Sequence, residues 1–554
     1  MTDHATDRTA RPTPGTARPT PGTARPATGA EPGRPRVHLA VEYAREQYSP
    51  VGDPDARDDH EVNVIVEVRT EGLEAVVPRR PPQRSEVVII DCSGSMAHPT
   101  LRKIAAARKA AAAAIERLPD GTHFALVAGT DTARLAYPAR DRLADPTEPA
   151  TVAATPATVA DGSRTARTLE AHGGTRISAW LTLAHRLLTA RPDAPFRHAL
   201  LLTDGRDEHG RAEELERVLD VCAGEFTCDA LGIGEDWDAA QLQRIADRLH
   251  GRAEAVVADG AEEFEAQLTG LFHELVGAST RRALPQLTLD VRTAPYLSVD
   301  LFRQVHPTVL DLTDTAVDEG DRTLFPTGAW GDEDRWYELR MRVDPDHPDH
   351  PGRREPHAAR LATVRLEAEG AEDVELPGEE HVTVRWTGEE APPTDLGTAG
   401  RHFRRQDELR EASRAGAMAL YHGETAEAER ELGRAVRLAY ELRDEARLER
   451  LRDLVTVEKA ALGQVRIRDD ITPGRVQALI VRSSHTAAPP SAHGRGGAPP
   501  SPSGGEPVRC ARCSARVRPG RFCENCGHPL DRSLDRSLDV SRGHRPGTSR
   551  TGER

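Results

Sequence analysis

Lysine, aromatic side chains and long apolar runs are all scarce in this 554-residue sequence. Only three of the 74 basic residues are lysines, Lys103, Lys109 and Lys459. We interpret that imbalance as the coding bias of a high-GC genome rather than as a functional signal. Aromatics make up 4% of the chain, and tracts too polar to pack a core explain part of that deficit.

The missing apolar runs bear on where the protein is located. No run of about 18 apolar residues is present, so we expect no membrane span. The first residues, MTDHATDRTARPTPG, lack the apolar stretch of a secretory signal, which predicts a cytoplasmic protein. The net charge of −15 disfavours nucleic acid as a partner, because a general nucleic-acid binder carries a basic footprint.

The chain is too long for one hydrophobic core, so we expect several domains. The motif TARPTPG occurs twice in residues 1–35, followed by TARPATG, and this Pro- and Gly-rich composition predicts a disordered tail that acts as a spacer. Residues 483–507 have the composition of a flexible linker, and residues 531–554 that of a second disordered tail.

Two separate regions show the period-2 alternation of half-buried strands. In residues 36–84 the apolar side chains of Val62, Val64, Val66 and Val68 share one face. Similar alternation returns across residues 281–388, which predicts an antiparallel β-sandwich. Because the early strands need partners, we expect the region between them to be an α/β domain inserted into a sandwich built from both flanks.

Residues 85–277 predict that α/β domain, a doubly wound, Rossmann-like fold. Continuous apolar strands at EVVII, HFALVAG, HALLLTDG and CDALGIG alternate with helical patterns, which indicates a mostly parallel sheet covered on both faces. The first helix is expected to turn one stripe inward, formed by Leu101, Ile104, Ala105, Arg108, Ala112, Ile115 and Leu118. Residues 144–170, rich in Ala, Thr and Pro, are expected to include an irregular insertion.

Residues 400–482 form a small α-helical segment in this interpretation. Its sequence YHGETAEAERELGRAVRLA is similar to part of a tetratricopeptide unit. One such unit cannot bury its face alone, so a plain helical hairpin packed on the sandwich is the favoured alternative. Residues 464–482 predict two short strands.

Polar side chains gather where the strands of the α/β domain end. They lie in DCSGS at 91–95, GGT at 173–175 and TDG at 203–205, and comprise Asp91, Ser93, Ser95, Thr175 and Asp204. Ligands bind beyond the carboxyl ends of such strands, and all five residues offer oxygen, which Mg²⁺ prefers. The structural alternative is that the hydroxyls only cap helices.

This order of motifs resembles the von Willebrand factor type A domain with a complete metal-ion-dependent adhesion site. The resemblance covers about residues 85–277 and implies that Ser93, Ser95 and Thr175 contact Mg²⁺ or Mn²⁺. It further implies that Asp91 and Asp204 act from nearby, and that an Asp or Glu of a protein partner supplies the last ligand. The arrangement is also similar to bacterial cytoplasmic proteins associated with phospho-signalling or metal-stress systems.

Four of the seven cysteines form a second metal-binding motif near the C-terminus. Cys510, Cys513, Cys523 and Cys526 follow the spacing C-x2-C-x9-C-x2-C, which predicts a structural Zn²⁺ ribbon over residues 508–530. This pattern fits a metal site in a reducing compartment better than a disulfide framework.

No catalytic constellation stands out in the sequence. Cys92 is expected to face the core and be unreactive, Cys222 and Cys228 to be packed thiols, and the 22 histidines lack ligand spacing. We therefore expect a non-enzymatic adaptor that binds an acidic partner through the metal. The alternatives are a nucleic-acid-associated factor using the zinc ribbon and a substrate-delivery subunit of an AAA+ ATPase.

Overall fold

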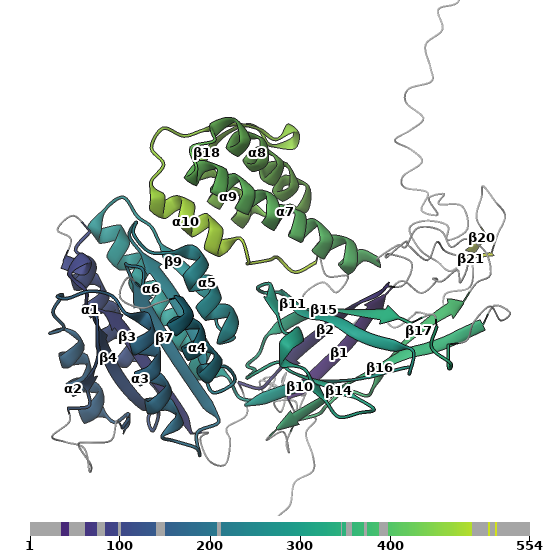
Figure 1. The fold of residues 1–554 in the computed structure, drawn as a ribbon, viewed down its shortest axis with the longest axis horizontal. Helices are drawn as coiled ribbons and strands as arrows, with labels where there is room; N and C mark the ends of the chain where they lie inside the picture. Colours follow the sequence, from purple (N-terminus) through teal and green to yellow (C-terminus); the bar gives the residue numbers. More distant parts are fainter. Residues whose placement is uncertain are drawn as a thin grey trace, which may run out of the picture. The chain divides into compact units, whose positions relative to one another are not determined.

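The computed structural model describes most of the chain between residues 35 and 489 (Figure 1). The described ranges are 35–43, 61–74, 83–97, 101–139, 150–207, 212–344, 346–350, 357–369, 374–386, 397–489, 508–509 and 516–517. The repeat tail, the four ribbon cysteines and residues 531–554 lie outside them. Near those cysteines, β20 (Val508–Arg509) pairs antiparallel with β21 (Arg516–Val517). Within the described ranges no helix is both long and apolar enough to cross a membrane.

A mixed sheet forms the centre of the α/β domain, with strand order β5-β4-β3-β7-β8-β9 and with β6 beside β4. Its parallel strands are β3 (Arg84–Asp91), β4 (His123–Gly129), β7 (Phe196–Thr203), β8 (Thr227–Ile233) and β9 (Ala253–Val256). The strands β5 (Ala133–Tyr137) and β6 (Val152–Ala153) run antiparallel to β4. The four long parallel strands are apolar on both faces, so the sheet needs a helical layer on each side.

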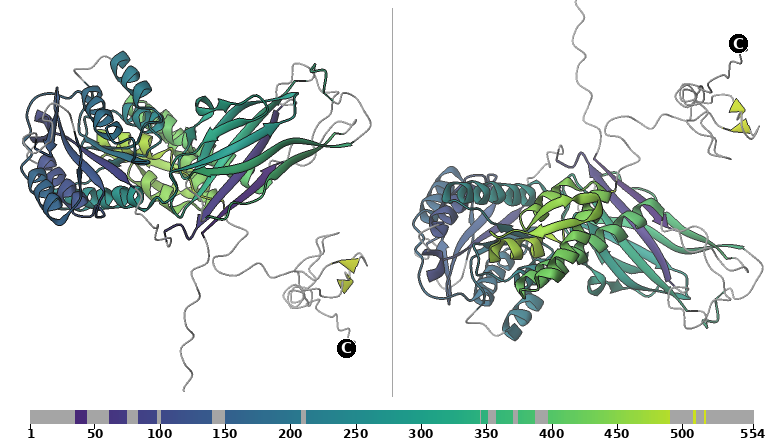
Figure 2. Two further views of the ribbon diagram at one scale, coloured as in Figure 1. Left: turned by 90° about the horizontal axis from the view of Figure 1, so that it is seen from below. Right: turned by 90° about the horizontal axis from the view of Figure 1, so that it is seen from above.

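Helices cover both faces of this sheet, as Figures 1 and 2 show. Val87 and Ile89 of β3 pack on the side of α3 (Ile177–Thr189), α4 (Ala212–Cys222) and α5 (Ala239–Arg248). Val88 and Ile90 face α1 (Lys103–Ile115), α2 (Pro156–Ala166) and α6 (Ala261–Arg281). This alternation from a single strand places two separate cores around one sheet.

Within the range 144–170, where an irregular insertion is expected, residues 156–166 form α2, and residues 144–149 lie outside the described residues. Thr155 caps this helix: its Oγ1 accepts the Thr158 backbone N–H at 3.2 Å, and Thr158 Oγ1 accepts the Thr155 N–H at 2.8 Å. Pro156 occupies the first turn, where its missing N–H costs nothing. A capping box built from two threonines lacks the usual Glu or Gln, which explains why the sequence pattern was not recognised.

The predicted inner face of the first helix is only partly right. Its second half is buried as expected, but Ile104, Ala105 and Arg108 are only half-buried, whereas Lys103 is 5% exposed. The helix begins at Lys103, after Arg102 adopts a left-handed conformation with φ 49°. Most of the buried residues of α1 are alanines. Because alanine is found on both the buried and the exposed face of a helix, the apolar stripe alone does not define how α1 is rotated about its axis.

Two five-stranded antiparallel sheets form a β-sandwich around a shared core that includes Val64, Leu289 and Phe302 (Figure 1). One sheet has the order β1 (Arg36–Tyr43), β2 (Glu61–Glu71), β15 (Asp334–Val343), β11 (Leu297–His306) and β12 (Leu310–Asp311). The other has the order β13 (Val317–Asp318), β14 (Thr323–Pro326), β10 (Gln286–Thr293), β16 (His357–Glu369) and β17 (Glu380–Trp386). Because β2 pairs with β15, strands from before and after the α/β domain share one sheet.

The helical segment contains α7 (Gly397–Tyr421), α8 (Thr425–Leu442), α9 (Glu445–Arg452), β18 (Val455–Lys459), β19 (Gln464–Ile467) and α10 (Pro473–Arg482). The prediction of two strands within 464–482 is wrong, because only β19 lies there and α10 follows it. Pro473 stands in the first turn of α10, after the N-cap residue Thr472. Seven of the ten helix residues are buried, so little of α10 faces water.

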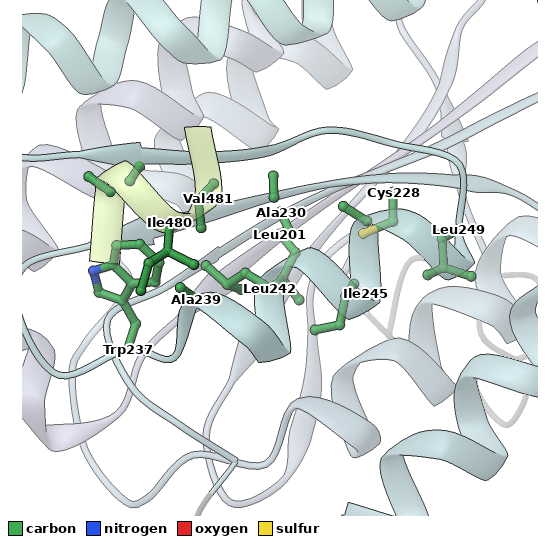
Figure 3. Close-up of a cluster of buried hydrophobic side chains, with 14 of the residues drawn as sticks. Leu201, Cys228, Ala230, Trp237, Ala239, Leu242, Ile245, Leu249, Ile480 and Val481 are labelled. Atoms are coloured by element: carbon green, nitrogen blue, oxygen red, sulfur yellow. The ribbon is translucent and has the colours of Figure 1, made fainter. Parts of the chain in front are cut away.

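The helical segment packs on two partners rather than on the sandwich alone. Phe403 of α7 contacts a cluster with Ile65 and Val305 of the sandwich. Figure 3 shows Ile480 and Val481 of α10 beside Trp237 and Leu242 of the α/β domain, all in one core cluster. A buried hydrogen bond from the Ala239 N–H to Gln477 Oε1, 3.1 Å long, fixes this contact.

The first residues of the predicted linker, 483–489, make specific contacts, and residues 490–507 lie outside the described residues. The Val309 N–H donates to the Ser484 carbonyl at 2.8 Å, and the Thr486 N–H donates to the Pro307 carbonyl at 2.9 Å. His402 Nε2 lies 2.8 Å from the Ala487 carbonyl oxygen. Residues 483–489 are therefore tied to the sandwich and to α7, a pairing that composition alone does not reveal.

Candidate oxygen-donor metal site

The five predicted site residues converge at the carboxyl edge of the α/β sheet. Strands β3 and β7 are parallel neighbours, so Asp91 and Asp204 at their ends come together with the loops that follow. Both carboxylates are fully buried. An open hollow of about 460 Å³ lies in front of them, lined by Ser93, Gly94, Ser95, Gly173, Gly174, Thr175, Gly205, Arg206 and Asp236.

The hydroxyls stand at separations suited to one small cation. Ser93 Oγ and Ser95 Oγ lie 2.9 Å apart, and Ser95 Oγ donates to Asp204 Oδ1 at 2.7 Å. In an octahedral Mg²⁺ shell with bonds of about 2.1 Å, neighbouring oxygens lie about 3.0 Å apart. The donor set, made only of hydroxyl and carboxylate oxygens, therefore fits a hard divalent cation.

Asp91 organises the site from behind. Its Oδ1 accepts the Ser93 N–H at 2.8 Å, and its Oδ2 accepts the Thr203 hydroxyl at 2.7 Å. Burial, together with the nearby negative charge of Asp204, raises the pKa of Asp91 to about 6. Two buried carboxylates so close together are costly unless positive charge lies near them.

Glycines let the three loops close around the hollow. The Gly94 N–H donates to the Gly173 carbonyl at 2.9 Å, which joins the serine loop to the threonine loop. Gly173 has φ +78°, and a Cβ there would lie 2.8 Å from Asp131 Oδ1. A Cβ on Gly205 would lie 3.0 Å from Thr175 Oγ1, so this position keeps space in front of the threonine hydroxyl.

The helix-cap alternative fails for the two long helices that follow these loops. Helix α1 has Arg102 as its N-cap and α3 has Arg176, and neither N-cap side chain makes a cap hydrogen bond; the Ser178 N–H of α3 instead donates to Asp207 Oδ2 at 3.3 Å. The hydroxyls of Ser93 and Ser95 instead bond to each other and to a buried carboxylate. Their arrangement therefore calls for an explanation other than capping.

The sequence interpretation missed one residue of this site. Lys103 Nζ lies 2.7 Å from Asp204 Oδ2, and the lysine side chain is only 6% exposed. The scarcity of lysine was attributed to coding bias, yet one of the three lysines occupies this buried position. One feature of the sequence could have pointed to Lys103: it lies eight residues after Ser95 in a chain whose other basic residues are almost all arginine.

The cysteines of the described region are not reactive candidates. Cys92 is 1% exposed and packs in the core on the α1 side of the sheet, as expected. Burial raises the pKa of its thiol to about 12. Cys222 and Cys228 are buried free thiols. Across the described residues no three His, Cys, Asp or Glu side chains gather as a metal site, and the hollow above differs because three of its five donors are hydroxyls.

A second cluster of ionisable groups, away from the carboxyl edge, holds three strands together. His198 Nδ1 lies 2.6 Å from Glu86 Oε1, and its Nε2 lies 3.2 Å from Asp229 Oδ2. Ser279 Oγ donates to Glu86 Oε2 at 3.0 Å. The two carboxylates raise the pKa of the buried His198 to about 9 against the opposing effect of burial. Because each charge has a partner inside the cluster, it explains strand cohesion and leaves no free ligand position.

Comparisons with known proteins identify the α/β domain. Residues 85–255 match the family model for the von Willebrand factor type A domain. The structure is similar to that of a von Willebrand factor type A protein from Catenulispora acidiphila, with 29% identity and a TM-score of 0.68 over 83% of this chain and 99% of that one. The ArnB paralog VWA2 from Sulfolobus acidocaldarius is 14% identical over 82% of this chain and 98% of that one, with a TM-score of 0.47.

A curated relative in Synechocystis sp., described as an uncharacterized protein, is 24% identical over 233 residues, which cover 41% of this chain. The matched part spans about half of that relative, 49% of its length. The family model and the Catenulispora structure both point to a domain of the von Willebrand factor type A kind. This chain therefore contains a von Willebrand factor type A domain, centred on residues 85–255.

Proposed function

We propose that the type A domain is a cation-dependent protein-binding module and that the chain acts as a non-enzymatic adaptor. The observation that carries the proposal is the convergence of three hydroxyls and two buried carboxylates on one open hollow. Ser93, Ser95 and Thr175 would hold Mg²⁺ or Mn²⁺ directly, with Asp91 and Asp204 behind them. When bound, the cation supplies a Lewis-acid position that an aspartate or glutamate of a protein partner can occupy.

The chain's own residues support a binding role in three ways. Asp91 holds the serine loop through the Ser93 N–H, so the hydroxyls are positioned before a partner arrives. The hydroxyl ligands are neutral, so they leave most of the charge of a dication uncompensated. The hollow is open, and Arg206 and Asp236 form part of its rim, where a partner's side chains can make further contacts.

The other regions would extend this adaptor role. We propose that the helical segment docks further proteins and that Cys510, Cys513, Cys523 and Cys526 hold a structural Zn²⁺ in a C-terminal ribbon. From the resemblance alone, we propose a cytoplasmic setting in a phospho-signalling or stress-response system. These modules would bring several partners to the protein held at the metal site.

An affinity pull-down from lysate of the native cells tests the proposal. Wild-type protein and the S93A/S95A variant are compared with Mg²⁺ and with EDTA, and S298A, an exposed serine of β11, serves as the matched control. EDTA can also strip zinc, so the double variant isolates the hydroxyl site. We expect a protein partner with wild type and S298A in Mg²⁺, and its loss with S93A/S95A. Recovery of the same partners by the double variant would contradict the proposal.

A further inference from the structure

The Asp204 carboxylate is shared between a candidate metal ligand and a buried lysine. Its Oδ1 accepts the Ser95 hydroxyl at 2.7 Å, whereas its Oδ2 accepts a hydrogen bond from Lys103 Nζ, also at 2.7 Å. The Asp204 side chain is fully buried and that of Lys103 nearly so. The lysine thus lies directly behind the carboxylate that accepts the Ser95 hydroxyl.

The space around this charge suits lysine. Gly234, in the turn after β8, has φ +77°, and a Cβ there would lie 2.7 Å from Lys103 Cε and 2.8 Å from its Nζ. Lysine carries a compact ammonium on a thin stem, whereas arginine ends in a wide planar fork. Arginine supplies 71 of the 74 basic residues of this chain, yet lysine occupies this confined position.

Helix α10 holds the confining turn in place. A Cβ on Gly474 would lie 2.4 Å from the Gly234 carbonyl oxygen, so the two backbones are in direct contact. Arg475 forms an ion pair with Asp259 at 2.8 Å on the same side of the domain. Lys103 is therefore enclosed between its own helix and a turn that cannot easily move away.

The charges of the site leave it one negative charge short for a dication. Asp91 and Asp204 together contribute two negative charges, and Lys103 removes one of them. We propose that Lys103 is an internal counter-charge that couples cation binding at Ser93, Ser95 and Thr175 to the capture of a carboxylate. This inference rests on the proposed function, and it adds that the cation is held weakly until an acidic group from a partner restores charge balance.

The coupling has a clear direction. A lysine ammonium paired with Asp204 would repel a dication held by the neighbouring hydroxyls, and even at an effective dielectric constant of about 20 such a repulsion would exceed the free energy of a tenfold change in affinity. An added carboxylate offsets that repulsion. Because linkage is reciprocal, a carboxylate that strengthens cation binding is itself bound more tightly when the cation is present.

Titration of the full-length, zinc-loaded protein with Mn²⁺ tests the inference, with free Mn²⁺ measured by electron paramagnetic resonance. Wild type, K103Q and K109Q are compared with and without acetate, the carboxylate probe, at constant ionic strength. Lys109 lies on the same helix as Lys103 and forms an exposed ion pair with Glu265. K109Q therefore removes one lysine charge, as K103Q does, but at an exposed position that makes no contact with Asp204. The side-chain amide introduced by K103Q retains an N–H donor toward Asp204. The S93A/S95A variant defines background binding.

We expect acetate to strengthen Mn²⁺ binding by wild type and K109Q. K103Q is expected to bind Mn²⁺ about tenfold more tightly without acetate and to lose most of the acetate effect. Unchanged or weaker Mn²⁺ binding by folded K103Q would overturn the inference. If K103Q does not fold, the wild-type titration still tests the inference. Wild-type Mn²⁺ affinity that is the same with and without acetate would also overturn the inference. Wild-type binding no tighter than that of S93A/S95A would instead overturn the proposed function, and this inference with it.

Discussion

Ser95 Oγ lies 2.7 Å from Asp204 Oδ1, although the two residues are 109 positions apart in the chain. Their contact joins the loop after β3 to the end of β7, and Lys103 completes it from the other side of the carboxylate. Since Asp204 and Lys103 are both buried, the stability of this edge depends on keeping the charges paired.

We therefore predict that D204N destabilises the cation-free protein by about 3 kcal/mol, because it leaves the Lys103 ammonium buried without a partner. The matched control is E265Q, which breaks the exposed pair between Lys109 of α1 and Glu265 of α6 and is expected to cost less than about 1 kcal/mol. Chemical denaturation of both variants in EDTA measures the difference. Equal losses of stability in D204N and E265Q would show that the buried Lys103–Asp204 pair contributes no more to folding than the exposed pair does.

The cluster around His198 predicts a stability loss at alkaline pH. The pKa of His198 is about 9 in the folded protein and about 6.5 when unfolded. Its stabilisation is therefore fully present below about pH 6.5 and disappears as the pH rises through about 9. H198Q is expected to lower the free energy of unfolding by about 3 kcal/mol near pH 6, and by much less near pH 10.

The control for this prediction is H422Q, at an exposed position in the turn between α7 and α8. Urea denaturation at several pH values, compared between each variant and wild type, measures the effect. A cost of H198Q that stays constant from pH 6 to pH 10 would mean that the histidine acts through packing rather than through its charge.

The backbone contact at Gly474 predicts that α10 tolerates no larger residue there. G474A places a methyl group 2.4 Å from the Gly234 carbonyl oxygen and is expected to destabilise the protein by about 1–3 kcal/mol. The control G270A, on α6, meets nothing within 4 Å and is expected to stabilise by up to about 1 kcal/mol, since alanine favours helix more than glycine does. Thermal unfolding should shift in opposite directions for the two variants.

The threonine capping box predicts a cost for T155A. Removing the hydroxyl that accepts the Thr158 N–H should destabilise α2 by about 1 kcal/mol. Thr182 is an exposed α3 residue whose hydroxyl only bonds back to the Ser178 carbonyl, so T182A is expected to be nearly neutral. Hydrogen exchange of the α2 amides should increase in T155A alone; unchanged exchange would contradict the cap.

Thiol reactivity separates the two groups of cysteines. Cys92, Cys222 and Cys228 are buried, so a thiol reagent should not reach them in the native protein. If the four C-terminal cysteines hold zinc, chelation should release four reactive thiols per chain, and denaturation three more. Four reactive thiols before chelation, in protein purified without chelator, would contradict the zinc ribbon.

Much of the site could be predicted because its parts lie at strand ends. The apolar runs before Asp91 and Asp204 identified parallel strands, whose carboxyl ends must meet at one edge. Lys103 could not be placed this way, because its burial depends on Asp204 and Gly234, which are distant in sequence. The orientation of α1 failed for a related reason, since alanines fit either face of a helix.

Helix α10 is short, and residues from the helical segment and from the α/β domain cover most of it. Its run of four apolar residues, ALIV, therefore does not by itself distinguish a helix from a strand. In contrast, Val62, Val64, Val66 and Val68 face a single core and are buried as their alternation predicts. The spacing of apolar residues identifies a helix or a strand most clearly where one side of the element faces water.

The hydrogen bonds of Arg84 show that the two ends of the type A domain meet. Arg84 begins β3, and its guanidinium donates to the Ser279 carbonyl at 3.3 Å and to the Arg282 carbonyl, where α6 ends. Entry and exit of the chain therefore lie side by side, at the edge opposite the candidate metal site. Both covalent connections of the domain therefore leave from one edge, and its candidate binding edge stays clear of them, although the contacts of α10 still tie the domain to the helical segment.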